Sequence, residues 1–210
     1  MDLSLDGGAV RGLERRGAAR PPILVLVMAA AFVLLVVALL IGSFTRPELP
    51  PFQLSVPHPA PVGDTLVGPA TYTLDASASD QWHRFRFARS AAVDSGAWDI
   101  AFRRFRLIAA PGAGIQDLGL VPFDSVALLP AEGYLPNDVA RDTTNPGVGK
   151  WYDYSMVTHL LTSKRHIYGV RTAEGKYAKL EMLAYYCREA GTACITFRYA
   201  YQGGSTRHVK

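Results

Sequence analysis

Residues 23–41 (ILVLVMAAAFVLLVVALLI) are apolar at every position, without a charge, a hydrogen-bonding side chain, a proline or a glycine. As a helix at about 1.5 Å per residue, this stretch is roughly 28 Å long, close to the ~30 Å hydrocarbon thickness of a bilayer. A helix in the core of a soluble protein would keep a polar face, which this one lacks. The pattern therefore predicts a transmembrane segment over residues 21–43, with an apolar helix from Ile23 through Ala30 to Ile41.

The arginines on either side of this helix predict its orientation. Residues 42–61 contain one arginine, Arg46. The leader contains four: Arg11, Arg15, Arg16 and Arg20. Because positive charge stays on the cytoplasmic side of a membrane, we expect the N-terminus to be cytoplasmic. Residues 1–20 would form a cytoplasmic tail, and everything after the helix would lie on the opposite side of the membrane.

A cleaved signal peptide is the alternative interpretation of this segment. The apolar run is longer than the about 7–15 residues of a signal-peptide core, and the leader before it is long. The sequence that follows, IGSFTRPELP, has no A-x-A-like cleavage site. These features favour an uncleaved anchor.

A proline-rich segment, residues 44–64, separates the helix from the rest of the chain. Prolines at this density favour extended polyproline II structure, which behaves as a semi-rigid spacer. They occupy positions 47, 50, 51, 57, 59 and 61.

The remaining residues, 65–210, alternate between apolar and polar positions in the way typical of β-strands. Glycines and prolines divide residues 108–150 into loops and short strands, a region of the kind that often binds ligands. We therefore expect one mainly β domain, too small to divide comfortably into two. The predicted strands cover residues 71–76, 81–88, 97–107, 151–157, 165–172, 176–187 and 194–202.

The last two predicted strands form a hairpin whose register can be tested. With Cys187 opposite Cys194, one side of the hairpin becomes entirely apolar or aromatic, as a core-facing side should be. Glu181 then lies diagonal to Arg198 on the other side. Two cysteines in an oxidising compartment, at this cross-strand spacing, favour a disulfide. The remaining pairs would be Tyr186–Ile195, Ala184–Phe197, Met182–Tyr199 and Leu180–Tyr201.

A group of arginines lies in the second and third predicted strands, interleaved with Trp82 and Trp98. If residues 97–107 form one strand, Phe102 shares a face with Arg104 and Arg106. The group is either a solvated sheet face or a docking surface for anionic lipid headgroups or an acidic protein. It comprises Arg84, Arg86, Arg89, Arg103, Arg104 and Arg106.

Composition narrows the class of partner further. The net charge is +4, of which the cytoplasmic tail supplies part, so the exported domain is only mildly basic. Nucleic-acid binders carry clustered positive charge, and none is expected as a partner here. Metalloprotease, nucleotide-binding and serine-hydrolase motifs are absent from the sequence, which favours a non-enzymatic protein without a metal site.

Several segments resemble the HmuY family of exported haem-binding proteins, over roughly residues 70–202. They are GAWDIAFRRF (96–105), FDSVALLPAEGY (123–134), KWYDYSMVTHLL (150–161), YGVRTAEGKYAKLEMLAYY (168–186) and ITFRYAYQ (195–202). The resemblance implies an all-β domain that holds haem between loops through two axial side chains. Since members of this family are exported bacterial proteins, it also implies a bacterial inner-membrane location for the helix and a periplasmic β domain. His159 falls in a matching segment and is the first candidate ligand, with His166 and Met156 as further candidates.

Two functions follow from these observations. In the first, the chain is a single-pass accessory subunit that docks on integral-membrane proteins and lipids, for instance in a photosynthetic or respiratory assembly. This function needs no cofactor, and the anchor would raise the effective concentration of the domain at its partner. In the second, the chain is a membrane-tethered haem-binding protein of the HmuY type.

Overall fold

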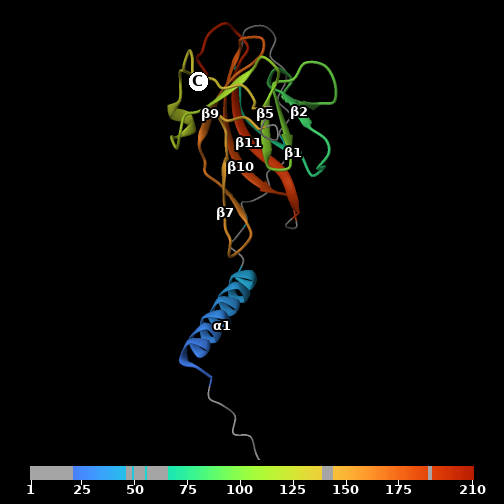
Figure 1. Cartoon of the computed structure of the whole chain (residues 1–210). Helices are drawn as coiled ribbons and strands as arrows, with labels where there is room; N and C mark the ends of the chain where they lie inside the picture. Colours follow the sequence, from blue (N-terminus) through green and yellow to red (C-terminus); the bar gives the residue numbers. More distant parts are fainter. Residues whose placement is uncertain (1–20, 46–48, 50–54, 56–65, 139–143, 189–190) are drawn as a thin grey trace, which may run out of the picture. The chain divides into compact units, whose positions relative to one another are not determined.

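A computed structural model describes the apolar helix and most of the β domain (Figure 1). The chain divides into two units, Met1–Thr45 and Arg46–Lys210. The predicted tail, residues 1–20, and nearly all of the predicted spacer lie outside the described residues. Those residues are 21–45, 49, 55, 66–138, 144–188 and 191–210.

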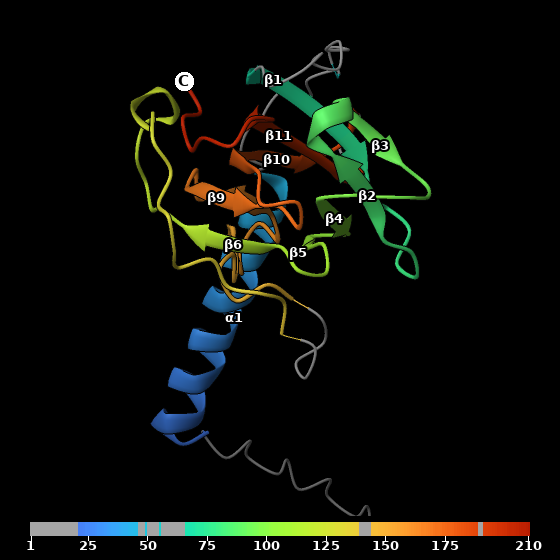
Figure 2. The ribbon, with the colours of Figure 1, turned by 90° about the horizontal axis from the view of Figure 1, so that it is seen from above.

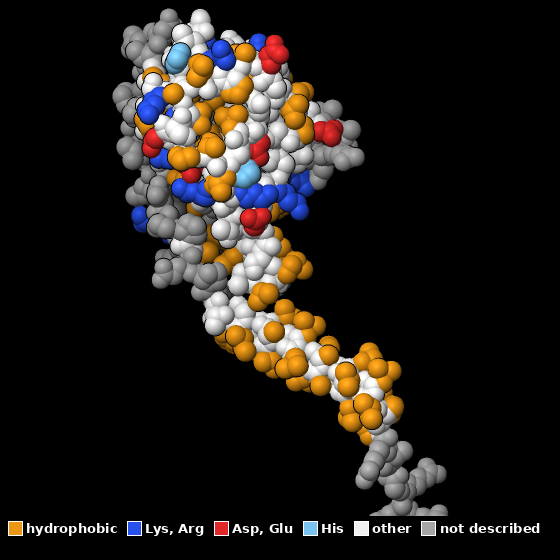
Figure 3. Space-filling model, turned by 90° about the vertical axis from the view of Figure 1, so that its left-hand side faces the viewer, with side chains coloured by type: hydrophobic (Ala, Val, Ile, Leu, Met, Phe, Trp, Pro, Cys, Tyr) orange, Lys and Arg blue, Asp and Glu red, His pale blue; other side chains and the backbone are white. Residues whose placement is uncertain are grey.

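Helix α1 (Ile23–Phe44) forms where the apolar run predicts it. Its large side chains are exposed all along its length, so the helix has no packed face of its own (Figure 3). The Thr45 hydroxyl donates to the carbonyl of Ile41 at 2.8 Å and satisfies one of the last carbonyls. The helix is long and apolar enough to cross a membrane.

The β domain is built mainly from two antiparallel sheets (Figure 2). A small hairpin, β7 (Tyr152–Tyr154) with β8 (Leu161–Ser163), forms a separate two-stranded sheet that belongs to neither. The larger sheet has the order β1 (Leu66–Asp75), β11 (Thr192–Gln202), β10 (Tyr177–Tyr186), β9 (Ile167–Arg171) and β6 (Gly114–Asp117). The smaller has the order β3 (Ala91–Val93), β2 (His83–Arg86), β4 (Ile100–Arg103) and β5 (Arg106–Ala109).

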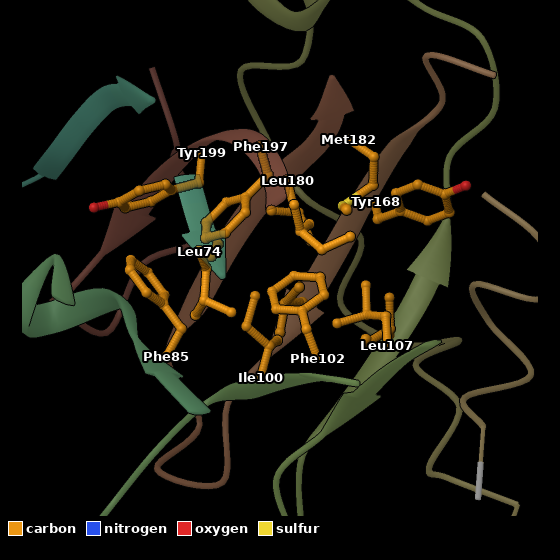
Figure 4. Packing of buried hydrophobic residues seen from close by; sticks show 14 of the residues in the cluster. Leu74, Phe85, Ile100, Phe102, Leu107, Tyr168, Leu180, Met182, Phe197 and Tyr199 are labelled. Carbon is orange, nitrogen blue, oxygen red and sulfur yellow. The ribbon is translucent and has the colours of Figure 1, made fainter. Parts of the chain in front are cut away.

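The core lies between the two sheets (Figure 4). Phe85 and Phe102 of the smaller sheet reach Phe197 on β11, with ring centroids 5.0 and 5.3 Å apart. Leu180 on β10 and Ile100 on β4 fill the same layer, and all five side chains are fully buried. The mainly β fold predicted from the sequence is confirmed.

The prediction of one strand over residues 97–107 is wrong, because the segment turns back on itself. Arg104 has a φ of 55°, in the left-handed region, and Arg103 pairs with Arg106 across the turn. Because of the turn, Ile100 and Phe102 on β4 pair with Ala109 and Leu107 on β5, and both strands contribute apolar side chains to the core. Arg104 therefore belongs to a turn and does not share a strand face with Phe102.

The register of the final hairpin differs from the prediction by two residues over most of its length. Leu180 lies opposite Tyr199, and Glu181 lies directly opposite Arg198. Irregularities between Met182 and Tyr186 cause the shift, together with Ala193, whose φ is 72°. Because side chains alternate with period two, the shift leaves the same residues on the core-facing side.

The predicted disulfide between Cys187 and Cys194 is confirmed, with the two Cα atoms 4.8 Å apart. It closes the end of the β10–β11 hairpin, where the backbone N–H of Cys187 also donates to the carbonyl of Gly191.

The side of the β10–β11 hairpin expected to be polar is covered as well. The short 3₁₀ helix η2 (Phe123–Ser125) packs over it, and Phe123 is buried. Glu181 is 4% exposed and accepts Arg165 and Arg198, each at 2.9 Å. These two ion pairs compensate for the buried charge.

Lys179 anchors η2 to the sheet. Its side chain is 1% exposed, and its ammonium group donates to the carbonyls of Phe123 and Val126 at 3.0 and 2.8 Å. The same nitrogen lies 4.3 Å from the ring centroid of Phe123. Burial lowers the pKa of Lys179, with the carboxylate of Asp124 acting in the opposite direction.

We expect Lys179→Met to lower the free energy of unfolding by about 1–3 kcal/mol, because two covered carbonyls lose their donor while the unbranched stem is kept. Urea denaturation measures the change. Lys176→Met, on the turn before β10, is the control and should change stability by less than about 0.5 kcal/mol. Equal effects of the two substitutions would contradict the anchoring role of Lys179.

Asp99 is a third buried ionisable side chain, after Glu181 and Lys179, and it holds the start of the 3₁₀ helix η1 (Phe87–Arg89). One of its carboxylate oxygens accepts the backbone N–H of Phe87 at 2.7 Å. Burial raises the pKa of Asp99 to about 6, against the opposing effects of that hydrogen bond and of Arg86. The folded state therefore binds this proton more tightly than the unfolded state, whose pKa is near 3.8.

Asp99 should make the protein less stable as the pH rises. A folded-state pKa above the unfolded value means that stability is highest below about pH 4 and falls by about 3 kcal/mol up to pH 7. In Asp99→Asn, which keeps an acceptor for Phe87, this part of the fall should disappear. Unfolding free energies of both proteins at pH 4 and pH 7 measure it. An unchanged difference between the two pH values would refute the assignment.

Candidate functional site

A cavity of about 850 Å³ opens beside the β7–β8 hairpin. Most of the side chains around it are aromatic or aliphatic, which is the usual composition of a small-molecule site. Residues from β7, β8, the end of β10, the start of β11 and the β4–β5 turn contribute to it. The lining consists of Leu49, Phe105, Lys150, Tyr152, Tyr154, Thr158, His159, Leu160, Leu161, Tyr185, Tyr186 and Thr192.

The hairpin is held against the domain at its base. Trp151 is 1% exposed, and its indole N–H donates to the carbonyl of Phe105 at 2.8 Å. On the other arm, the backbone N–H of Leu161 donates to the hydroxyl of Tyr186 at 2.7 Å, and Ser163 donates to the carbonyl of Met182. These bonds fix the hairpin and so define one wall of the cavity.

His159 lies in the loop that closes the β7–β8 hairpin. It has a φ of 57°, and its backbone N–H donates to the carbonyl of Ser155 at 2.8 Å. Its Nδ1 atom lies 2.6 Å from the hydroxyl oxygen of Tyr154. When Nδ1 carries the proton and donates it to Tyr154, Nε2 keeps a free lone pair, as a metal-bound imidazole requires.

Four tyrosines contribute hydroxyl groups or ring faces to the same cavity. Tyr185 and Tyr186 are nearly buried, with ring centroids 5.3 Å apart in an edge-to-face arrangement. Burial raises the pKa of Tyr152 and of Tyr186. These two phenols therefore stay protonated and neutral at physiological pH. Lys150 is an exposed cation at the same cavity.

Of the three candidate ligands predicted from the sequence, only His159 lines the cavity. His166 bonds instead through Nδ1 to the carboxylate of Asp117, at 2.9 Å, beside β6 and β9. Met156 is 72% exposed in the hairpin loop. The four tyrosines were not predicted as site residues. Their clustering in the segments YDY and AYY was the available signal, although such aromatic runs are more often core.

The predicted arginine surface consists of two groups. On β2, Arg84 lies 5.8 Å from the ring of Trp98, and Arg86 pairs with Glu174 at 2.7 Å. Arg89 follows β2 at the end of η1. The remaining three arginines lie at the β4–β5 turn, where a hollow of about 280 Å³ is lined by Ser79, Arg103, Arg104, Phe105 and Arg106.

Neither a family model nor a curated protein matches the sequence. Solved structures match its β domain. A Bacteroides vulgatus ATCC 8482 protein described as HmuY-like and haem-binding has a TM-score of 0.53 at 16% identity, with 62% of this chain and 90% of that chain covered. The domain has an HmuY-like fold.

Two further solved structures, one of them described as an HmuY analog, match the same domain. The apo HmuY analog of Tannerella forsythia has a TM-score of 0.52 at 15% identity and covers 63% of this chain and 94% of that chain. Apo PinO from Porphyromonas gingivitis has a TM-score of 0.54 at 13% identity and covers 66% and 97%. The resemblance predicted from the sequence is thus confirmed for the fold, and no neighbour named here is described as an enzyme.

The cavity of this HmuY-like domain fits a haem group in size and in chemistry. Its volume lies within the about 300–1,000 Å³ range of ligand pockets. It presents an imidazole, which is a haem-iron ligand in proteins, and neutral phenol groups that can donate hydrogen bonds to a bound ligand. The aromatic walls suit a flat apolar macrocycle, and Lys150 is a cation that suits a propionate.

Proposed function

We propose that the chain is a membrane-tethered haem-binding protein whose ligand occupies the cavity beside the β7–β8 hairpin. The observation that carries this proposal is the position of His159, an imidazole in an aromatic cavity with Nδ1 bonded to Tyr154. His159 would hold the haem iron through Nε2, and the rings and hydroxyl groups of the lining tyrosines would hold and orient the macrocycle.

Three features of the cavity support haem over other ligands. The lining aromatic rings offer stacking faces and edges to a porphyrin. Lys150 provides a charge-assisted bond to a carboxylate. When bound, haem supplies a redox-active iron, and the residues named here would bind and orient it and limit its access to water.

We propose further that α1 is kept as an uncleaved anchor, with the N-terminus in the cytoplasm and the β domain in the periplasm. The arginines before the helix and the length of the apolar run support this orientation. A tether of this kind would concentrate bound haem at the inner membrane.

Haemin titration tests the haem proposal. The wild-type protein should bind haemin with a shifted Soret band. His159→Ala should abolish the shift, and Tyr154→Phe should weaken binding by about 10–100-fold, because it removes the partner that orients the imidazole. His166→Ala is the matched control and should bind as the wild type does. An unshifted wild-type spectrum, or loss of binding in His166→Ala alone, would overturn the proposal.

Docking of the chain as an accessory subunit on an integral-membrane assembly, photosynthetic or respiratory, is a second candidate. The observation that favours it is the exposed apolar surface along the whole of α1, where Ala29, Ala30 and Ala31 form a patch suited to close helix packing.

Native electrophoresis after mild detergent extraction tests this second candidate. The chain should migrate in a large complex, and Ala30→Leu should release it by blocking close approach, while Leu34→Ile should not. Migration of the wild-type chain as a free monomer in every detergent would exclude the candidate.

A further inference from the structure

The loop of the β7–β8 hairpin exposes apolar side chains at its end. Met156 is 72% exposed, Tyr154 49% and Val157 48%. Adjacent apolar residues at the tip of a protruding hairpin are costly in water, so they indicate a surface that meets something apolar. In Figure 1 this hairpin projects from the body of the β domain.

Phe105 extends this apolar surface onto the β4–β5 turn. It is 38% exposed, and its ring centroid lies 5.5 Å from that of Tyr152 at the base of the hairpin. Phe105 lines three hollows: the aromatic cavity, the arginine hollow and a third hollow that includes Arg106 and Lys150. The hairpin and the arginine turn therefore form one continuous surface.

The charges around this apolar surface are mostly positive. Its cations are Arg103, Arg104, Arg106, Lys150 and Lys164. Two carboxylates belong to the same segments: Asp153, 4.0 Å from the ammonium group of Lys164, and Asp80, next to Ser79 of the arginine hollow. Figure 3 shows a band of Lys and Arg side chains along one edge of the β domain.

Two arginines of the turn are held in place by neighbouring groups. The guanidinium of Arg103 lies 4.6 Å from the ring centroid of Trp82, and Arg104 donates to the carbonyl of Ser77. Stacking on an aromatic ring and a backbone hydrogen bond reduce the side-chain entropy that binding an anion would otherwise cost.

We propose that this surface, formed by the hairpin tip and the basic β4–β5 turn, docks on the anionic lipid surface of the membrane that anchors the chain. Met156 and Val157 would enter the boundary between headgroups and acyl chains, and the arginines would contact lipid phosphates. This combination of inserted apolar residues and flanking cations is the physical basis of interfacial membrane binding.

The proposal rests on the proposed anchoring by α1. The 20 residues between Thr45 and Leu66 span at most about 70 Å when fully extended, so an anchored domain always stays within reach of the bilayer. At such an effective concentration, a weak surface contact is enough to keep the domain docked. An acidic face of another protein would match the charges but would leave Met156 and Val157 without an apolar partner.

Fluorescence of a probe at the hairpin tip tests this docking. The chain has two cysteines, both in the disulfide, so Met156→Cys introduces a unique thiol for an environment-sensitive dye. The labelled full-length chain is reconstituted in vesicles of phosphatidylcholine with or without phosphatidylglycerol. Thr206→Cys is the matched control for dye placement, because Thr206 is exposed after the C-terminal end of β11 and does not belong to the proposed docking surface.

We expect the tip dye to shift to the blue and to be quenched by brominated lipid in the anionic vesicles, and the control dye to do neither. Arg103→Gln together with Arg106→Gln should weaken docking by about fivefold for each charge removed. High salt should act in the same direction. A tip dye that stays in water in both kinds of vesicle would overturn the proposal, as would one protected only in native membranes, which would indicate a protein partner.

Two further measurements separate this outcome from failure of the proposed function. Flotation of the vesicles in alkaline carbonate reports insertion of α1 independently of the dye. Haemin titration of the Arg103→Gln, Arg106→Gln protein reports the cavity. A chain that floats and binds haemin, but whose tip dye remains in water, refutes lipid docking alone.

Discussion

Burial of both faces of the β10–β11 hairpin is the constraint on which the rest of the domain depends. One face supplies Phe197 and Leu180 to the core between the sheets, and the other carries Lys179 and Glu181 beneath η2. Covered charges need partners, and Lys179 finds them in two carbonyls of the 123–126 segment. The long loop region is thereby tied to the sheet at a defined place.

The same hairpin also positions the candidate site. Tyr185 and Tyr186 lie at the end of β10 nearest the disulfide, where the regular pairing with β11 is interrupted. Their rings form a wall of the cavity. The Tyr186 hydroxyl accepts the backbone N–H of Leu161 and so holds the β7–β8 hairpin that carries His159. The β10–β11 hairpin thus contributes both to the core and to the wall of the cavity, and it holds the β7–β8 hairpin with its exposed apolar tip.

Prediction from the sequence succeeded where one physical requirement dominates. One structure accounts for each of three patterns: the apolar run of α1, the period-two alternation of the long strands and the cysteine pair. Prediction was less successful where the sequence does not show whether a segment continues as one strand or turns back. In residues 97–107, apolar side chains alternate from Trp98 to Phe102, which predicts one strand that continues through the arginines. The left-handed Arg104 instead divides the segment into two strands that pair with each other.

The sequence by itself determined the apolar helix, the mainly β domain and the disulfide, because these follow from local composition and periodicity, and its matching segments indicated the HmuY-like fold. Only the tertiary structure decided the hairpin register, the burial of Lys179 and the grouping of His159 with four tyrosines. Those depend on which segments, distant in sequence, cover one another. His159 and His166 look alike in the sequence, but one lines a cavity and the other pairs with Asp117, because different loops bring their neighbours to them.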